Sequence, residues 1–207
     1  MLFRSGKIFR WAQHWERLGR GAKFLRFGAL PGEPELQKAA TELIARNAAR
    51  DAVLRITISR GSGPRGYSAR GADTPRVVMT LHPTSADALT VEPPTWRLMT
   101  SSIRVAAGDQ LAGFKHTSKL ANVLARSEAE AADAAEAVLV NTEGFVTECA
   151  AANLFWIREG RIETPPLSGE LLGGVTRAVV LEVCAALKIP VRDARATVAE
   201  LRNAEGV

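Results

Sequence analysis

Residues 113–177 read GFKHTSKLANVLARSEAEAADAAEAVLVNTEGFVTECAAANLFWIREGRIETPPLSGELLGGVTR, and this stretch decides the fold of the second half of the chain. It carries three chemically distinct groups on a run of helix and strand signals. A lysine, Lys115, stands at the entry to a predicted helix, and a carboxylate, Glu148, follows on a predicted β-hairpin. The turn GGVT at 173–176 then opens a second helix. A site built from an amine, a carboxylate and a helix N-terminus is therefore the first hypothesis.

Periodicity around these groups predicts a mixed α and β domain. Apolar spacing after Lys115 predicts a helix that buries Leu120, Val123 and Leu124. Apolar, β-branched segments separated by short turns predict two hairpins, and a strongly apolar helix ends the stretch. The predicted elements are a helix over 116–131, strands over 135–141 and 145–149, a hairpin around 158–160 and a helix over 175–189.

The first half of the chain shows the same mixture in a smaller unit. The alternation in VLRITIS (53–59) places Leu54, Ile56 and Ile58 on one face of a half-buried strand. The predicted elements are a strand over 6–12, helices over 14–27 and 35–49, and strands over 53–59 and 76–83. Residues 84–95 lack a periodic pattern, and their later part is typical of an interdomain linker. We therefore predict an α+β protein with a small domain over 1–88, a linker over 89–95 and a larger domain over 96–207.

Composition narrows the class of ligand. The chain has 207 residues, 46% of them hydrophobic, which is enough for a substantial core. The net charge of +5 suits nucleic acid or an anionic substrate, but the 27 basic residues are scattered without a run of like charge. Tyr67 is the single tyrosine, so the chain lacks the aromatic-plus-basic clusters of an RNA-binding surface. The scattered basic residues therefore predict a solvated, arginine-rich surface, and an anionic ligand would need only a few of them. Nucleic acid is not expected.

The cysteines and the N-terminal sequence predict the cellular compartment of the protein. Cys149 and Cys184 have neither metal-binding nor disulfide spacing, so we expect reduced thiols and no metal site. The start MLFRSGKIFRW has no apolar signal-peptide core. No apolar run approaches the roughly 18 residues of a membrane helix. A cytoplasmic protein that does not enter the membrane is the expectation.

Several motifs occur in the order in which one known family carries them. They are HWERL (14–18), ITISRGSGPRGYS (56–68), LAGFKHTSKLANVLARSEA (111–129), GFVTECAAANLFWIREGRIETP (144–165) and LLGGVTR (171–177). On these motifs the chain resembles the fold-type IV, class IV aminotransferases, which use pyridoxal 5′-phosphate. The resemblance implies a two-domain fold like that of D-amino-acid aminotransferase. Its N-terminal domain would be an α/β sandwich and its C-terminal domain β-barrel-like with helices.

The resemblance, carried over position by position, implies a cofactor site. Lys115 looks like the Schiff-base lysine, Glu148 like the partner of the pyridine nitrogen, and Arg17 like a phosphate ligand. The remaining implied contacts are Leu172 against the cofactor ring and Val175 with Thr176 at the phosphate. The residue types suit these roles, because an amine can hold an aldehyde cofactor and a helix N-terminus can hold phosphate. From spacing alone the alternatives are a surface lysine, a surface arginine, a solvated glutamate and a plain turn.

The resemblance leaves more than one reaction open. SRGSGPRGYS, LAGFKH and TECAAANLFW are most similar to 4-amino-4-deoxychorismate lyase, which releases pyruvate and forms 4-aminobenzoate for folate synthesis. Arg60 and Arg65 are then candidates for the substrate carboxylates, and a plain surface loop is the alternative. An aminotransferase acting on D-amino or branched-chain amino acids with 2-oxoglutarate would use the same residues. A non-catalytic remnant is a hypothesis of another class.

The resemblance also has implications for the two ends of the chain and for its oligomeric state and substrate. Family members carry a further stretch before Gly6, and they continue past Val207 with a strand and a second phosphate contact. We therefore expect the chain to be truncated at both ends. The resemblance further implies a homodimer that acts on a small amino substrate.

Overall fold

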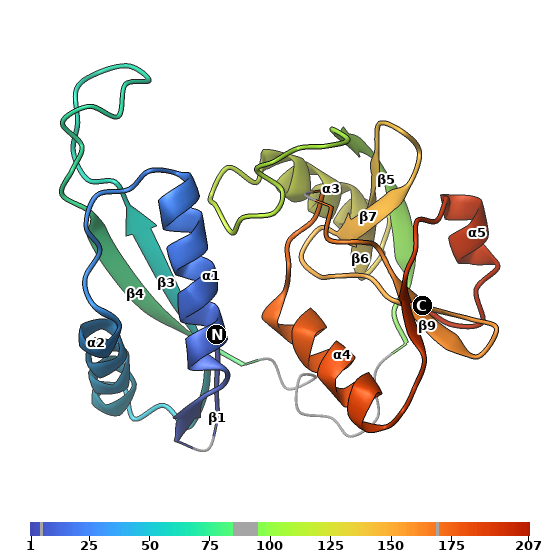
Figure 1. Ribbon diagram of the computed structural model, residues 1–207, viewed down its shortest axis with the longest axis horizontal. Coiled ribbons are helices and arrows are strands. Elements are labelled where there is room, and N and C mark those ends of the chain that lie inside the picture. The colour runs from blue at the N-terminus through green and yellow to red at the C-terminus, as the bar shows by residue number, and fades with distance from the viewer. Residues whose placement is uncertain (5, 85–94, 169) are drawn as a thin grey trace. The chain divides into compact units, whose positions relative to one another are not determined.

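The computed structural model describes residues 1–4, 6–84, 95–168 and 170–207 (Figure 1). The chain divides into two compact units, Met1–Pro93 and Pro94–Val207. Each unit has its own sheets and its own apolar core. The linker predicted over 89–95 lies, except for its last residue, outside the described residues.

The first unit is a two-layer arrangement of helices on an antiparallel sheet. The strands are β1 (Leu2–Arg4), β2 (Lys7–Ile8), β3 (Asp51–Ser59) and β4 (Arg76–Pro83), in the order β2-β1-β3-β4. The helices are α1 (Trp11–Phe24) and α2 (Glu33–Arg46). Both helices pack their apolar residues against β3 and β4 (Figure 1). The strand predicted over 6–12 is shorter than expected, because α1 already begins at Trp11.

Alternation along β3 explains this packing. Leu54 is fully buried and Ile56 packs beside it, whereas Val53 on the opposite face is exposed. Trp11 of α1 and Leu36 of α2 close the core over that face. The predicted inward face of 53–59 is thereby confirmed at Leu54 and Ile56, because strand side chains alternate between the two faces of a sheet.

The second unit contains two three-stranded sheets among its described residues. The first has the order β5-β6-β7, formed by Leu98–Val105, Glu136–Asn141 and Val146–Cys149. The second has the order β10-β9-β8, formed by Val191–Asp193, Arg161–Thr164 and Trp156–Arg158. The helices are α3 (Leu120–Ala131), α4 (Val175–Ala186) and α5 (Val198–Arg202). The predicted α+β class is confirmed, and the barrel-like description of this domain stays a prediction.

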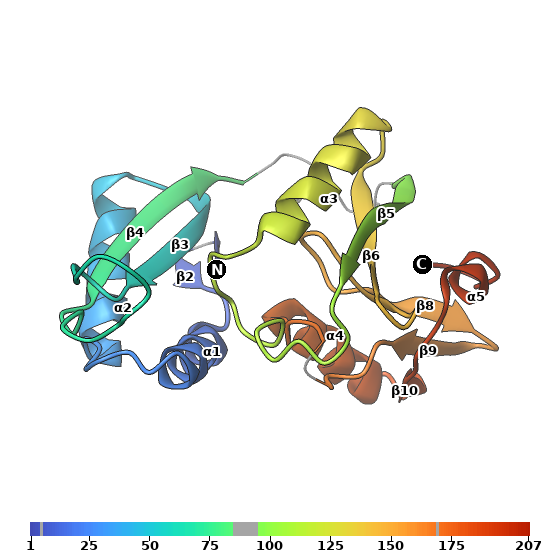
Figure 2. The ribbon, with the colours of Figure 1, turned by 90° about the horizontal axis from the view of Figure 1, so that it is seen from above.

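The strand β6 is buried along its whole length because both of its faces are covered. Val138 and Val140 join a cluster that contains Trp156 of β8 and Leu201 of α5. The alternate residues, including Leu139, face α3, which runs along β5 and β6 (Figure 2). Strand β7 hydrogen-bonds to β6, so Glu148 is carried into the interior of this unit.

The helix α3 corrects one prediction. It begins at Leu120 rather than at 116, and Leu120, Val123 and Leu124 are 69%, 59% and 45% exposed. The buried side chains of this helix are Ala125 and Ala129, which lack any exposed surface. Small side chains let the helix axis lie close to the sheet, so the alanine stripe packs inward and the larger residues turn outward. Lys115 consequently lies in the loop before α3 rather than at a helix start.

Among the described residues, no helix has the length and apolar composition required to span a bilayer. The two cysteines, Cys149 and Cys184, are buried free thiols. No described group of histidine, cysteine or acidic residues is arranged to hold a metal ion.

Candidate active site

Glu148 is the buried carboxylate of the second unit. It lies on β7 with 9% of its surface exposed, and its Oε2 accepts a hydrogen bond from the backbone N–H of Leu172 at 3.1 Å. Burial raises the pKa of Glu148, while the Leu172 hydrogen bond and the positive charges of Lys119 and Lys115 oppose that rise. A buried carboxylate in this setting favours a cationic partner.

Lys115 is an exposed residue of the loop that joins β5 to α3. Its positive charge favours the carboxylate form of Glu148, with a smaller effect than that of Lys119. The pairing of Lys115 and Glu148 in one cofactor site stays a prediction. Glu170 anchors this loop: its Oε1 accepts from the N–H of Gly108 at 3.1 Å, and its Oε2 accepts from Asn141 Nδ2 at 3.0 Å. The carboxylate of Glu170 thereby connects three parts of the unit: the β5–α3 loop that carries Lys115, the end of β6, and the segment that precedes α4.

The segment before α4 forms the third part of the site. Leu172 and Val175 are buried and Thr176 is exposed. Gly174 is the N-cap residue of α4, no described side chain caps this end, and its first turn holds no acidic residue. Free N–H groups and the positive end of the helix dipole make such a terminus suitable for an anion such as phosphate.

Arg177 fixes the start of α4 from the other side. Its guanidinium is buried and donates to Pro165 O at 3.1 Å and to Asp193 Oδ1 at 3.0 Å. Its Nε lies 3.4 Å from Thr164 Oγ1. These contacts tie α4 to β9 and β10, so the helix N-terminus has a fixed position within the second unit.

Arg17 belongs to the first unit, in α1. Its guanidinium donates to His14 Nδ1 at 3.3 Å, and burial followed by the charge of Arg20 lowers the pKa of Arg17. Burial, the N-terminal charge and Arg17 lower the pKa of His14 to about 4, so the imidazole is neutral at pH 7 and its Nδ1 accepts. The predicted approach of Arg17 to a phosphate in the other unit stays a prediction.

The arginines of the Gly-rich loop after β3 have different surroundings. Arg60 donates to the carbonyls of Leu25 and Arg26, the latter at 2.7 Å, and lies over the Phe27 ring at 4.7 Å. Arg60 therefore caps the C-terminal end of α1. Arg65 is exposed in the same loop, which extends beyond the ends of β3 and β4 (Figure 1). The substrate-binding roles of both arginines stay predictions.

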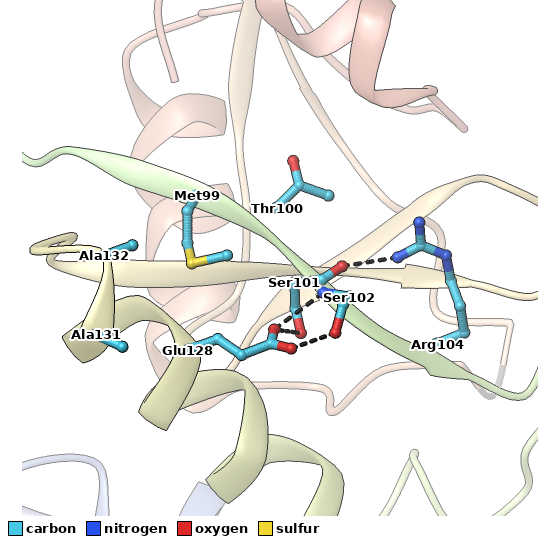
Figure 3. A pocket seen from close by; sticks show the side chains of 8 residues that line it. All are labelled: Met99, Thr100, Ser101, Ser102, Arg104, Glu128, Ala131 and Ala132. Carbon is cyan, nitrogen blue, oxygen red and sulfur yellow. Dashed lines mark hydrogen bonds between the residues drawn. The ribbon is translucent and has the colours of Figure 1, made fainter.

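A separate hollow of about 560 Å³ lies between β5 and the end of α3 (Figure 3). Glu128 there accepts hydrogen bonds from the hydroxyls of Ser101 and Ser102, and from the N–H of Ser102 at 2.9 Å. These hydrogen bonds, led by that from Ser101, lower the pKa of Glu128. Arg104 donates to the Ser101 carbonyl at 2.7 Å. These polar groups support the irregular pairing of β5 with β6 between Thr100 and Arg104, so we assign the hollow a structural role.

Residue patterns alone missed three polar residues that build this site. Asn153 donates through Nδ2 to the Leu172 carbonyl at 2.8 Å, and Arg177 and Glu170 make the contacts given above. Asn153 and Arg177 belong to the TECAAANLF and LLGGVTR motifs, so their motif positions were an available signal. Glu170 had none, because its partners lie 29 and 62 residues away in the sequence.

Known proteins are similar to this sequence along nearly its full length. The whole chain, residues 1–207, matches the family described as amino-transferase class IV. An aminodeoxychorismate lyase of Vibrio harveyi is 30% identical over 204 residues, which cover 99% of this chain and 74% of the relative. A D-alanine aminotransferase of Bacillus licheniformis is 28% identical over 206 residues, which cover 98% of this chain and 70% of the relative.

Solved structures agree with the sequence relatives. The T.th. branched-chain amino acid aminotransferase with pyridoxamine 5′-phosphate is 30% identical and superposes with a TM-score of 0.85. The superposition covers 95% of this chain and 65% of that one. Because the family match extends over the full chain and the lyase relative is 30% identical across most of its own length, the chain belongs to the class IV aminotransferase family of pyridoxal-phosphate-dependent enzymes.

Proposed function

We propose that this chain binds pyridoxal 5′-phosphate in its second unit and catalyses a reaction on a small amino substrate. The observation that carries this proposal is the connection of Glu148 to the start of α4 through Leu172. A carboxylate for a ring nitrogen and an uncapped helix N-terminus for a phosphate are thereby held by one short segment. The charge of Lys115 acts on the same carboxylate.

The chemistry of these groups fits the cofactor. Burial of Glu148 favours a cationic partner, which a protonated pyridine nitrogen supplies. The first turn of α4 has no carboxylate that would repel a phosphate, and Thr176 adds an exposed hydroxyl. A solved relative contains pyridoxamine 5′-phosphate, which supports the assignment. Arg17 would add a positive charge to the phosphate, as the family resemblance implies.

Each residue of the proposed site would have a separate role in the reaction. Pyridoxal phosphate supplies an electron sink for charge that develops on the substrate. Glu148 would keep the ring nitrogen protonated, and Leu172 would pack against the ring. Lys115 would hold the cofactor through its amine and would afterwards take a proton from the substrate. Val175 and Thr176 hold the phosphate with backbone N–H groups.

For the reaction we infer 4-amino-4-deoxychorismate lyase activity. Lys115 would remove the proton from the ring carbon that bears the amino group, and the carbon–oxygen bond to the enolpyruvyl group would break. The removed proton ends on the three-carbon product, so 4-aminobenzoate and pyruvate account for all substrate atoms. Arg60 and Arg65 would bind the substrate carboxylates. The motif SRGSGPRGYS and the 30% identical lyase relative favour this reaction.

A class IV aminotransferase is the second candidate. The D-alanine aminotransferase of Bacillus licheniformis is 28% identical, close to the value for the lyase, and the same lysine and carboxylate would serve that reaction. Lys115 would then move the proton between the substrate carbon and the cofactor carbon.

One pair of assays separates the two reactions. The purified protein, loaded with pyridoxal phosphate, is incubated with aminodeoxychorismate and, separately, with D-alanine or a branched-chain amino acid plus 2-oxoglutarate. The proposal expects 4-aminobenzoate and pyruvate in the first mixture, and neither product with Lys115→Ala. Transamination without 4-aminobenzoate would overturn the lyase assignment in favour of the aminotransferase. Absence of cofactor binding would favour the non-catalytic alternative.

We also propose that the protein is a homodimer, as the family resemblance implies, and that it acts in the cytoplasm, as its two cysteines without disulfide spacing indicate. Sedimentation velocity of the purified chain tests this assembly, and a single species of about 22 kDa would contradict it.

A further inference from the structure

Asn153 lies in the turn between β7 and β8 and contacts two parts of the site at once. Its Nδ2 donates to the carbonyl of Leu172 at 2.8 Å, while the N–H of Leu172 donates to Glu148 Oε2 at 3.1 Å. The two hydrogen bonds hold the peptide groups on both sides of the Leu172 Cα. The backbone of Leu172 therefore cannot rotate without breaking one of them.

Gly174 shows how closely this amide is packed. A Cβ at position 174 would lie 2.1 Å from Asn153 Oδ1, far inside van der Waals contact. The backbone of Gly174 has φ −68° and ψ 142°, a conformation open to every residue, so its geometry alone does not require glycine. A Cβ at Gly173 would meet only the Leu167 side chain, at an ordinary 3.7 Å. Of the two glycines, Gly174 is the one whose Cβ would displace the Asn153 amide.

We propose that Asn153 is a positioning residue that aligns the Glu148 carboxylate with the N-terminus of α4 through the backbone of residues 172–174. This inference rests on the proposed function in treating Glu148 and α4 as the two cofactor contacts. Without the Asn153 hydrogen bond, the peptide group after Leu172 is free to turn. The N–H that reaches Glu148 and the first turn of α4 then lose their common anchor.

Loss of the Asn153 hydrogen bond would be detected through the pKa of Glu148, which depends on the groups that face this carboxylate. Lys115 and Lys119 act on it as positive charges, and the Leu172 N–H is its hydrogen-bond donor. The neighbouring Cys149 thiol stays neutral, because burial and then the charges of Glu136 and Glu148 raise the pKa of Cys149 to about 12. Weakening the Leu172 hydrogen bond removes an interaction that favours the carboxylate. The Glu148 carboxyl should therefore titrate at higher pH when Asn153 is changed.

A matched control is present in the same unit. Asn122 Nδ2 donates to the carbonyl of Ala150 at 2.9 Å, which is also a partly buried bond from an asparagine side chain to a backbone carbonyl. The hydrogen bond of Asn122 ends on a different segment from Leu172. Asn122→Ala therefore removes a comparable bond from the turn that carries Asn153, while it leaves the Asn153–Leu172 and Leu172–Glu148 hydrogen bonds in place.

The first test needs no cofactor. The carboxyl titration of Glu148 is followed by NMR in the full chain with ¹³C-labelled glutamate, and assigned with Glu148→Gln. We expect Asn153→Ala to shift the Glu148 titration to higher pH and Asn122→Ala to leave it in place. An unchanged Glu148 titration in Asn153→Ala, or an equal shift in both variants, would overturn the proposal.

Gly174→Ala provides a second route if Asn153→Ala does not fold. The added methyl group displaces the amide without removing it, so the same upward shift is expected. In the Asn153→Ala background, Gly174→Ala should add nothing, because the displaced group is already gone. Additive effects of the two substitutions would contradict the proposal.

The affinity for pyridoxal phosphate tests whether the Asn153 hydrogen bond matters for the proposed function. Equilibrium dialysis with pyridoxal phosphate should show a loss of roughly tenfold for Asn153→Ala, about the effect of one hydrogen bond, and no loss for Asn122→Ala. If wild type and Asn153→Ala bind pyridoxal phosphate with equal affinity, the proposal that Asn153 aligns the cofactor contacts is wrong. If the wild type binds no cofactor, the proposed function fails, and the cofactor-free titration still decides whether Asn153 positions Glu148.

Discussion

Glu148 combines two influences that change its ionisation in opposite directions. Burial disfavours the carboxylate, while the Leu172 hydrogen bond and the charges of Lys119 and Lys115 favour it. Burial dominates, and the pKa of Glu148 in the folded protein lies above the ordinary value of 4.5. The site therefore holds a carboxylate whose cost of burial would be offset by a bound cation.

This raised pKa predicts a pH dependence of stability. Between about pH 4.5 and the raised folded pKa, the native state binds more protons than the unfolded state, so stability falls as pH rises. Glu148→Gln cannot titrate. Urea unfolding of the cofactor-free protein should therefore show the wild type losing stability relative to Glu148→Gln as pH rises from 4.5. A difference that is constant with pH would contradict the assignment.

The two loop arginines should differ in their contribution to stability, because Arg60 hydrogen-bonds to the carbonyls at the C-terminal end of α1 and Arg65 is exposed. Arg60→Ala removes two hydrogen bonds and the contact with Phe27, so we expect a loss of about 1–2 kcal/mol in the free energy of unfolding. Arg65→Ala should change stability by less than about 0.5 kcal/mol but raise KM for the substrate. Urea melts and steady-state kinetics measure both. A KM that is unaffected by Arg65→Ala would remove this residue from the substrate site.

Motifs identify candidate residues in this chain but not the surroundings of those residues. Lys115 and Glu148 could be selected from motifs, whereas the burial of Glu148 and its hydrogen bond from the Leu172 N–H could not. The capping role of Arg60 could not be predicted, because its carbonyl partners lie 34 and 35 residues away. Asn153 had a motif position but no sign of its partner Leu172, which follows 19 residues later.

Among the elements, α3 shows where periodicity is insufficient. The spacing of Leu120, Val123 and Leu124 predicted an apolar face, yet Ala125 and Ala129 are the buried residues. Hydrophobic spacing cannot distinguish a stripe of large side chains from a neighbouring stripe of small ones when the sheet requires close approach. Strands β3, β4 and β6 were predicted within two residues of their ends, because their alternation or apolar runs are strong and turns bound them.

The alanine stripe yields a prediction with a control on the same helix. Ala129→Leu should lower the free energy of unfolding by roughly 1–3 kcal/mol, because the buried site beside Leu139 has no room for three more carbons. Ala131→Leu, at an exposed position of α3, should be close to neutral. Thermal or urea unfolding tests the pair. Equal tolerance at both positions would contradict the close packing of α3 on the sheet.

For the whole molecule, the α+β class and the order of most elements follow from the sequence, and the family follows from the motifs together with the match over residues 1–207. The choice between lyase and aminotransferase does not follow from the sequence, because relatives named for either activity are 28–30% identical to this chain. Both reactions use the same amine and carboxylate. The difference depends on the residues that bind the rest of the substrate, and motif positions define those only as candidates.

The proposed function depends most on Lys115 as the attachment point of pyridoxal phosphate. To test this, the loaded protein is reduced with borohydride, digested and mapped by mass spectrometry, with Lys115→Ala as the control. We expect a phosphopyridoxyl group on Lys115 in the wild type and no specific attachment in the variant. Attachment at another lysine, such as Lys119, or no attachment in the wild type, would contradict the assignment.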